Sequence, residues 1–234
     1  MDLIVAGVRW PLASVEGASW LDDPKRAPPV TDGAPRKAER VRGIVVHTTR
    51  GARGGKLRPG GQASTRAETL ARYQAQTARE VSWHITIDTD GTVLQQADLA
   101  TWMAWHAGHA NAWTVGVELV QHPESADLWD AQLAALVAVC DAAAVALAIP
   151  RRVLLDAGGA PLLSPVRGLL SPAARSRDGA LLGGRGERWG GAIGHCNVVP
   201  AHVRGPGDPG PLPFDALLRA GWAGLAASPD GLLP

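Results

Sequence analysis

A chain of 234 residues, 46% of them hydrophobic and 19% charged, is long enough for one domain with a buried core. Its formal net charge of +1 lacks the basic surplus that phosphate binding needs, so nucleic acid is not expected as the main partner. No stretch approaches the roughly 20 apolar residues of a membrane span, and Asp2 stands where an export signal would be basic. We therefore expect synthesis in the cytoplasm without a signal peptide, and no membrane partner.

The first part of the chain predicts an irregular arm followed by a buried strand. Residues 1–40 are rich in proline and charge and carry no clear period. Residues 43–47 form a short β-branched run that ends in polar residues, which is typical of a buried strand. After a glycine-rich loop, Thr65 and Glu68 form a capping box that predicts a helix to about residue 79.

The middle of the chain predicts strands and then a long helix. Residues 82–88 alternate as a strand, and an Asp-Gly turn leads into a returning strand at 93–95. A further strand is expected over residues 114–120. Ser125 then caps a helix that Pro150 closes, and the apolar stripe of this helix makes Cys140 a core residue with a free thiol.

The last part predicts a long inserted loop over residues 151–190 and a short helix from Phe214 to Trp222. Strands mixed with helices at these spacings indicate an α/β fold, with a central mixed sheet flanked by helices. The domain would cover residues 41–225, between the N-terminal arm and a tail over residues 226–234.

Three polar residues lie in or beside buried strands, where burying a polar group without a partner costs free energy. His47 ends a buried strand, Glu118 lies inside an apolar one, and His195 follows the run 191–194. Two imidazoles and a carboxylate suit a catalytic zinc site with an open fourth position, and Asp208 is the best third ligand. Gly116 shares a strand face with Glu118 and leaves room for a group to approach that carboxylate.

The sequence motifs around these residues resemble those of the N-acetylmuramoyl-L-alanine amidase type 2 family. This family includes phage endolysins, muropeptide-recycling amidases and peptidoglycan recognition proteins. The resemblance spans roughly residues 41 to 222, and its motifs occur in the family's order. They are Ile44-Val45-Val46-His47-Thr48-Thr49, the segment 81–93, Ala104-Trp105-His106-Ala107-Gly108, Val115-Gly116-Val117-Glu118-Leu119, and Gly194-His195-Cys196-Asn197 continuing to Asp208-Pro209-Gly210-Pro211.

The resemblance implies a role for individual residues. Three of them would bind Zn²⁺, namely His47, His195 and Asp208. Glu118 matches the family's catalytic acid, and His106 matches a histidine that lines the substrate cleft. The neighbouring residues expected to meet substrate are Trp105 and His84, with Trp83 and Trp113 as further tryptophan candidates. His84 lies on an alternating strand and is expected to be a structural or cleft-wall histidine rather than a metal ligand.

One position departs from the family pattern. The family usually has a lysine two residues before the ligand aspartate, where this chain has Pro206. Arg204 is the first candidate to supply the missing positive charge, and His202 is the second. Because the guanidinium group of arginine is planar and permanently protonated, it is not equivalent to the ammonium group of a lysine.

The resemblance implies hydrolysis of the amide between N-acetylmuramic acid and L-alanine in peptidoglycan or a muropeptide. Two settings remain open, a phage-type endolysin released by a holin and a cytoplasmic anhydro-muropeptide recycling amidase. The extra arm and the inserted loop favour the endolysin, whereas Asp208 as third ligand resembles the recycling branch. A non-catalytic peptidoglycan-binding module and a structural zinc domain are the alternatives from other classes.

Overall fold

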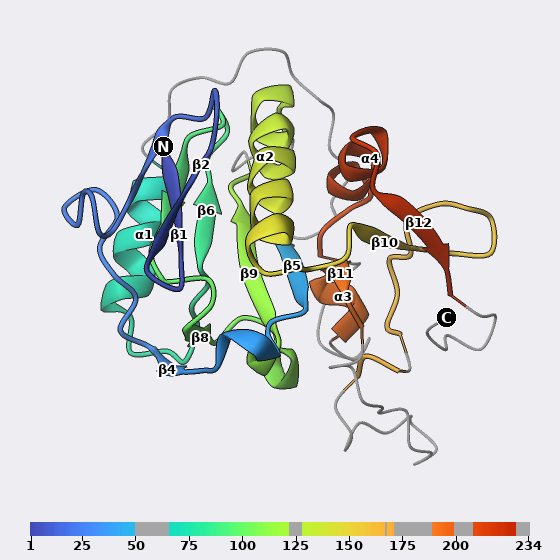
Figure 1. Ribbon diagram of the computed structural model, residues 1–234, viewed down its shortest axis with the longest axis horizontal. Coiled ribbons are helices and arrows are strands. Elements are labelled where there is room, and N and C mark those ends of the chain that lie inside the picture. Colours follow the sequence, from blue (N-terminus) through green and yellow to red (C-terminus); the bar gives the residue numbers. More distant parts are fainter. Residues whose placement is uncertain (50–65, 122–127, 167, 171–188, 199–207, 228–234) are drawn as a thin grey trace.

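The computed structural model describes residues 1–49, 66–121, 128–166, 168–170, 189–198 and 208–227 (Figure 1). The strands are β1 (Asp2–Val5), β2 (Val8–Pro11), β3 (Gly17–Ser19), β4 (Gly33–Pro35), β5 (Gly43–Thr48), β6 (Ile85–Ile87), β7 (Val93–Gln95), β8 (Trp102–Ala104), β9 (Thr114–Leu119), β10 (Arg152–Leu155), β11 (Gly191–Gly194) and β12 (Ala223–Ala226). The helices are α1 (Arg66–Gln76), α2 (Asp130–Ala146), α3 (His195–Val198) and α4 (Leu212–Arg219), with the 3₁₀ helices η1 (Ala38–Arg40) and η2 (Gly108–Ala112).

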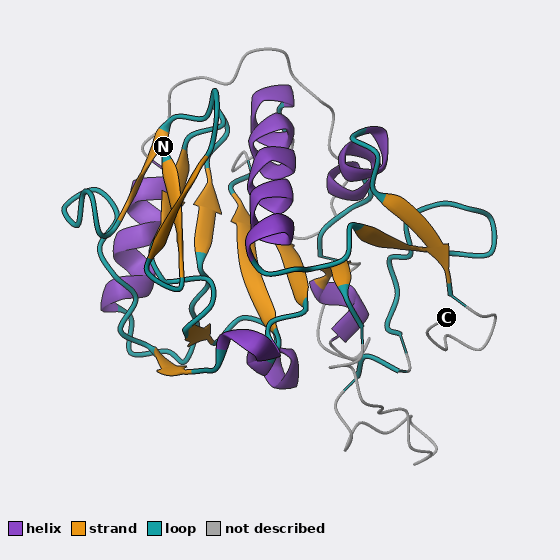
Figure 2. Cartoon of the chain, in the orientation of Figure 1, coloured by secondary structure: helices purple, strands orange, loops and turns teal. Residues whose placement is uncertain are grey.

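An eight-stranded sheet with the order β12-β10-β11-β5-β9-β6-β7-β3 organises the described residues. Its strands are parallel to their neighbours except where β6 meets β7, so the sheet is mixed. Two smaller pairs, β1-β2 and β4-β8, stand beside it (Figure 2). This arrangement confirms the predicted α/β class with a central mixed sheet flanked by helices.

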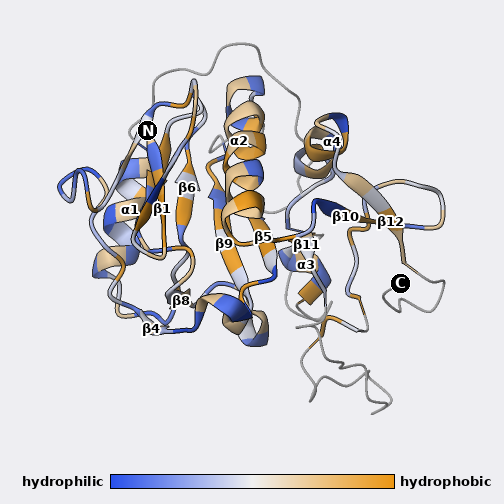
Figure 3. Cartoon of the chain, in the orientation of Figure 1, coloured by the Kyte–Doolittle hydropathy of each residue, from blue (hydrophilic) through white to orange (hydrophobic). Residues whose placement is uncertain are grey.

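The sheet buries both of its faces. One face carries Ile44, Val46 and Val117, and it packs in one cluster with Leu136 of α2 and Phe214 of α4. The opposite face carries residues that alternate with these, and they form separate clusters near α1 and near η2. Figure 3 shows the resulting apolar colouring of the central strands. Near-continuous apolar runs are expected of parallel strands that are covered on both sides.

Truncation of Leu136 is expected to destabilise the protein strongly. This side chain is 0% exposed in the main core cluster, and Leu136→Ala should lower the free energy of unfolding by about 2–5 kcal/mol through lost burial and a residual cavity. Val145→Ala on the same helix is the control, because Val145 is 68% exposed and should change stability little. Urea unfolding followed by circular dichroism compares the two variants. Equal midpoints would contradict the packing described for this face.

The expectation of an irregular N-terminal arm is wrong, because short strands occupy this segment. β1 and β2 form an antiparallel hairpin whose Leu3 and Val5 belong to the main core cluster. β3 pairs with β7 and forms one edge of the central sheet, and β4 pairs with β8. The proline and charge content of this segment concealed the strands, and for β3 and β4 the pairing partners also lie far along the chain.

The expected inserted loop at 151–190 also needs correction, because it begins with a strand of the central sheet. β10 lies between β11 and β12 and pairs in parallel with both. Residues 167 and 171–188 lie outside the described part. β12 was not expected either, because its Ala-Gly-Leu-Ala sequence has no strand signal of its own.

The expected helices are present with shifted ends. α1 ends at Gln76 rather than near residue 79, and α4 spans Leu212–Arg219 rather than residues 214–222. The long helix begins at Asp130, and the caps proposed at Thr65 and Ser125 lie outside the described residues. Both cysteines are free, with Cys140 buried as predicted. None of the described helices has the length and apolar character needed to cross a membrane.

Candidate metal and active site

Three adjacent parallel strands bring the predicted site together at one edge of the sheet. His47 lies at the carboxyl end of β5, Glu118 at that of β9, and His195 directly after β11. Ligand sites in open α/β sheets lie outside the carboxyl ends of the strands. The residues are far apart in sequence, and the β11-β5-β9 order makes them neighbours.

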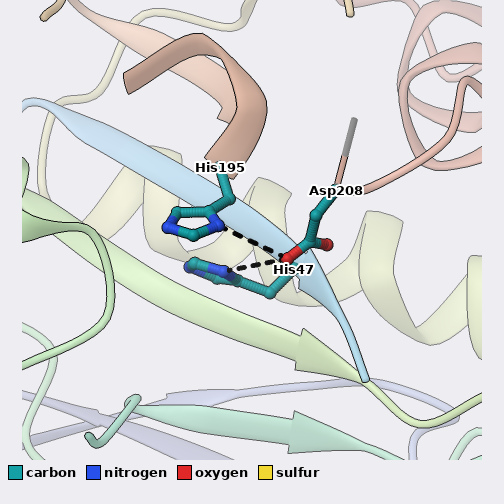
Figure 4. Close-up of side chains that lie close together, drawn as sticks. All are labelled: His47, His195 and Asp208. Atoms are coloured by element: carbon teal, nitrogen blue, oxygen red, sulfur yellow. Dashed lines mark ion pairs between the residues drawn. The ribbon is translucent and has the colours of Figure 1, made fainter. Parts of the chain in front are cut away.

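His47, His195 and Asp208 form a cluster whose possible ligand atoms all lie within 4.8 Å of one another. Asp208 Oδ2 is 3.7 Å from His47 Nδ1 and 3.5 Å from His195 Nδ1. Figure 4 shows the three side chains pointing toward one another. The predicted metal ligands are therefore together, with the Nδ1 atom of each imidazole facing the same carboxylate oxygen.

These distances fit a tetrahedral zinc ion. Zinc–nitrogen and zinc–oxygen bonds of about 2.0–2.2 Å at a tetrahedral angle place neighbouring ligand atoms about 3.3–3.6 Å apart. The separations from Asp208 Oδ2 are close to this value. Three protein ligands leave a fourth position open, as catalytic sites do. The donor set and its spacing thus suit one Zn²⁺.

Thr48 fixes the orientation of the Asp208 carboxylate. Its backbone N–H donates to Asp208 Oδ1 at 2.6 Å, and its hydroxyl donates to the same oxygen at 3.0 Å. Oδ2 is thereby left for the two imidazoles. The sequence reasoning did not single out Thr48, although its place as a polar residue immediately after a strand-end histidine was a usable signal.

The electrostatics of the cluster favour an ionised Asp208. Burial by itself raises the pKa of this carboxyl, but the contacts with His195, His47 and the Thr48 N–H outweigh it and hold the pKa well below its ordinary value. Burial also lowers the pKa of His47 and so favours a neutral ring. An ionised carboxylate and a neutral imidazole are the forms that bind a metal ion.

Glu118 lies beside His47, and burial makes its carboxyl group costly to ionise. The two residues are register partners on β9 and β5, so their side chains emerge on the same face of the sheet. Glu118 is only 9% exposed. Burial, and then the charge of Asp208, raise its pKa well above the ordinary value. The raised pKa favours the protonated carboxyl group, which can donate its proton to a substrate atom.

His106 occupies the space that Gly116 provides. A Cβ on Gly116 would lie 2.7 Å from His106 Cγ and 2.9 Å from His106 Nδ1. The room beside Glu118 on β9 is therefore filled by an imidazole of the protein. His106 Nδ1 is 3.1 Å from His47 Nε2, so His106 contacts a predicted metal ligand directly.

His84 is a buried structural residue, which corrects its prediction as a substrate contact. It is 0% exposed, its Nδ1 accepts from the Gly116 N–H at 3.0 Å, and its Nε2 lies 2.9 Å from the Trp102 carbonyl oxygen. Burial, and then the charge of Arg36, lower its pKa to about 3, so the ring is neutral.

The other expected substrate contacts fall into three groups. Trp105 is half-buried directly before His106 and stays a candidate. Trp83 and Trp113 are 7% and 3% exposed, so both are core residues. His202 and Arg204, together with Pro206, lie outside the described residues, and their roles stay predictions.

The fold and this cluster define an α/β protein with a candidate single-metal site at the carboxyl edge of its sheet. The chain belongs to the N-acetylmuramoyl-L-alanine amidase family, whose sequence profile matches residues 37–210. This match confirms the resemblance stated from the motifs and supports peptidoglycan amidase activity.

Several solved structures are similar to this chain. They include the endolysin N-acetylmuramoyl-L-alanine amidase LysCS from Clostridium intestinale URNW, with 14% identity over 59% of this chain and 78% of that one and a TM-score of 0.36. The catalytic domain of XlyA has 21% identity over 58% and 80%, with a TM-score of 0.40. Staphylococcus aureus hydrolase AmiA, in complex with its ligand, has 16% identity over 65% and 62%, with a TM-score of 0.37. These TM-scores are too low for a comparison of the site. No curated protein matches the sequence.

Proposed function

We propose that the protein is a zinc-dependent hydrolase of the amide between N-acetylmuramic acid and L-alanine in peptidoglycan. The observation that carries this proposal is the cluster of His47, His195 and Asp208 beside Glu118, within a chain of the amidase family. The two imidazoles and the carboxylate would hold Zn²⁺. When bound, such an ion supplies Lewis acidity and lowers the pKa of a coordinated water from about 15.7 to about 7.

In this proposal Glu118 moves the proton. As a carboxylate it accepts a proton from the attacking water, and as a carboxylic acid it delivers that proton to the departing alanine nitrogen. The burial that raises its pKa favours the second role, and a cation at the neighbouring cluster would favour the first. Arg204, with His202 as the second candidate, would stabilise negative charge on the lactyl carbonyl oxygen, in place of the family's lysine.

Metal analysis combined with chelation tests the proposal. The purified protein should contain one zinc ion per chain and should release the peptide from muramoyl-tripeptide. Treatment with a chelator should remove the ion and the activity together, and stoichiometric zinc should restore both. Hydrolysis that survives complete metal removal would contradict the zinc-dependent mechanism. Zinc binding without hydrolysis would instead identify a non-catalytic peptidoglycan-binding module.

As the biological setting we propose a phage-type endolysin. The recycling amidase is the second candidate, favoured by a carboxylate rather than a thiolate at the third ligand position. The sequence argument from an extra arm loses weight, because residues 1–40 contribute strands to the fold. Clearing of turbid purified cell walls would support the endolysin. Cleavage of soluble anhydro-muropeptide, with intact walls left turbid, would support the recycling amidase.

A further inference from the structure

A chain of hydrogen bonds leads from the backbone of η2 to the cluster of candidate metal ligands, and Thr114 is its first side chain. The Thr114 hydroxyl donates to the Ala110 carbonyl oxygen at 2.7 Å. A hydroxyl has one proton, and a carbonyl oxygen can only accept. Toward any other neighbour, Thr114 Oγ1 is therefore an acceptor.

His106 is the next member of the chain. Its Nε2 lies 3.4 Å from Thr114 Oγ1, which is the longer of the two contacts of that hydroxyl. Since Thr114 Oγ1 accepts here, His106 Nε2 carries the proton. A neutral imidazole has one protonated nitrogen, so His106 Nδ1 is left with a lone pair.

His47 completes the chain. Its Nε2 lies 3.1 Å from His106 Nδ1, and because that atom accepts, His47 Nε2 must be the donor. The lone pair of His47 is then on Nδ1, the atom that faces Asp208 Oδ2 among the candidate metal ligands. With the opposite proton arrangement, His47 Nδ1 would carry a hydrogen toward Asp208 Oδ2, 3.7 Å away, and could not bind a cation. The contact of His47 Nε2 with His106 Nδ1 is shorter, at 3.1 Å, and favours the proton on Nε2.

Two features hold the His106 ring in this place. Asn111 Oδ1 accepts from the backbone N–H of His106 at 3.0 Å and from that of Ala107 at 2.6 Å, which fixes the turn that carries the ring. On the other side, Gly116 leaves the space the ring occupies, where any Cβ would come within 2.7 Å of it. The ring is only 9% exposed.

We infer that His106 and Thr114 are positioning residues that fix the His47 imidazole as its Nε2–H tautomer and so direct Nδ1 to the metal. This inference rests on the proposed zinc function. It assigns His106 to the support of a ligand, whereas the motif resemblance implies contact with substrate. Partners of this kind orient metal-binding histidines and raise their basicity.

The tautomers can be read directly in the metal-free protein. In ¹⁵N-histidine-labelled protein, two-bond ¹H–¹⁵N correlation spectra should show both His47 and His106 protonated at Nε2. A His47 protonated at Nδ1 in that spectrum would overturn the inference. This measurement does not depend on zinc. A parent chain that binds no zinc would therefore contradict the proposed function, while the spectrum still decides the hydrogen-bond chain.

Zinc affinity, measured by competition with a chromophoric chelator, gives the second readout. His106→Phe and Thr114→Val should weaken zinc binding by about 10- to 100-fold, because each breaks the chain of hydrogen bonds without replacing a metal ligand. Two conservative variants should bind zinc nearly as tightly as the parent. Thr114→Ser keeps the hydroxyl, and His106→Asn places an acceptor oxygen where Nδ1 stood. Unchanged affinity in both Thr114→Val and His106→Phe, with folding verified by circular dichroism, would overturn the inference.

Discussion

The Glu118→Gln variant is expected to lose hydrolysis of muramoyl-tripeptide by about 10²- to 10⁴-fold while it keeps its full zinc content. Glutamine has nearly the shape of glutamate, but it can neither accept the proton of the attacking water nor deliver one to the leaving nitrogen. The ligands His47, His195 and Asp208 are untouched, so metal binding should not change. Peptide release followed by chromatography, together with metal analysis of the same preparation, checks both halves of the expectation.

The matched control for this variant is Glu39→Gln. Glu39 lies exposed on η1, and its substitution removes the same charge without entering the site. It should leave turnover and zinc content at the parent level. The buried Glu118→Gln side chain should not unfold the protein, because an amide is less costly to bury than an ionised carboxylate. Normal turnover in Glu118→Gln would remove Glu118 from the mechanism.

The Asp208→Asn variant is expected to lose zinc itself, and with it all hydrolysis. Thr48 donates two hydrogen bonds to Asp208 Oδ1, and this arrangement selects the oxygen of an amide at the same place. The amide nitrogen would then face His47 and His195 with its hydrogens, where the parent has an anionic oxygen. The loss of zinc affinity should exceed the roughly 10- to 100-fold expected for breaking a supporting contact.

Chelator competition and metal analysis measure this loss. Asp130→Asn is the control, because Asp130 is an exposed aspartate in the first turn of α2 and is not a member of the cluster. The control should bind zinc as the parent does. One tightly held zinc ion per chain in Asp208→Asn would contradict the assignment of Asp208 as a ligand, and the third position would then have to be sought elsewhere.

Three groups of variants distinguish the catalytic residue, the metal ligands and the residues that position a ligand. Substitution of Glu118 is expected to remove chemistry and keep the metal, and substitution of Asp208 to remove both. Substitution of His106 or Thr114 should weaken the metal without removing any ligand. A site in which these residues merely supported the fold would instead show parallel losses of stability and of zinc in all the variants.

The main strands and the ligand types could be predicted from the sequence because their signals are local. The runs at β5 and β9 are apolar and β-branched, and a histidine or glutamate inside such a run is conspicuous. The apolar stripe that places Cys140 in the core is also a local pattern. These features depend on periodicity within one segment, which a reader of the sequence can follow.

The strands that were missed depend on partners far away. β3 pairs with β7, and β10 and β12 pair with each other, although none of the three has a strong strand pattern. Proline and charge in residues 1–40 predicted an irregular segment, yet β1 gains its burial by packing with α2. Tertiary pairing outweighed local propensity in each case.

What the sequence determined by itself was the set of chemical groups, two histidines and two carboxylates at or beside buried strands, and the family to which their motifs belong. Only the tertiary structure decided which atoms of those groups meet. The parallel order β11-β5-β9 brings His195, His47 and Glu118 to one edge, Thr48 turns Asp208 toward the rings, and Gly116 admits His106. The physical reason is that ring orientation and proton position depend on neighbours in space, which no spacing along the chain encodes.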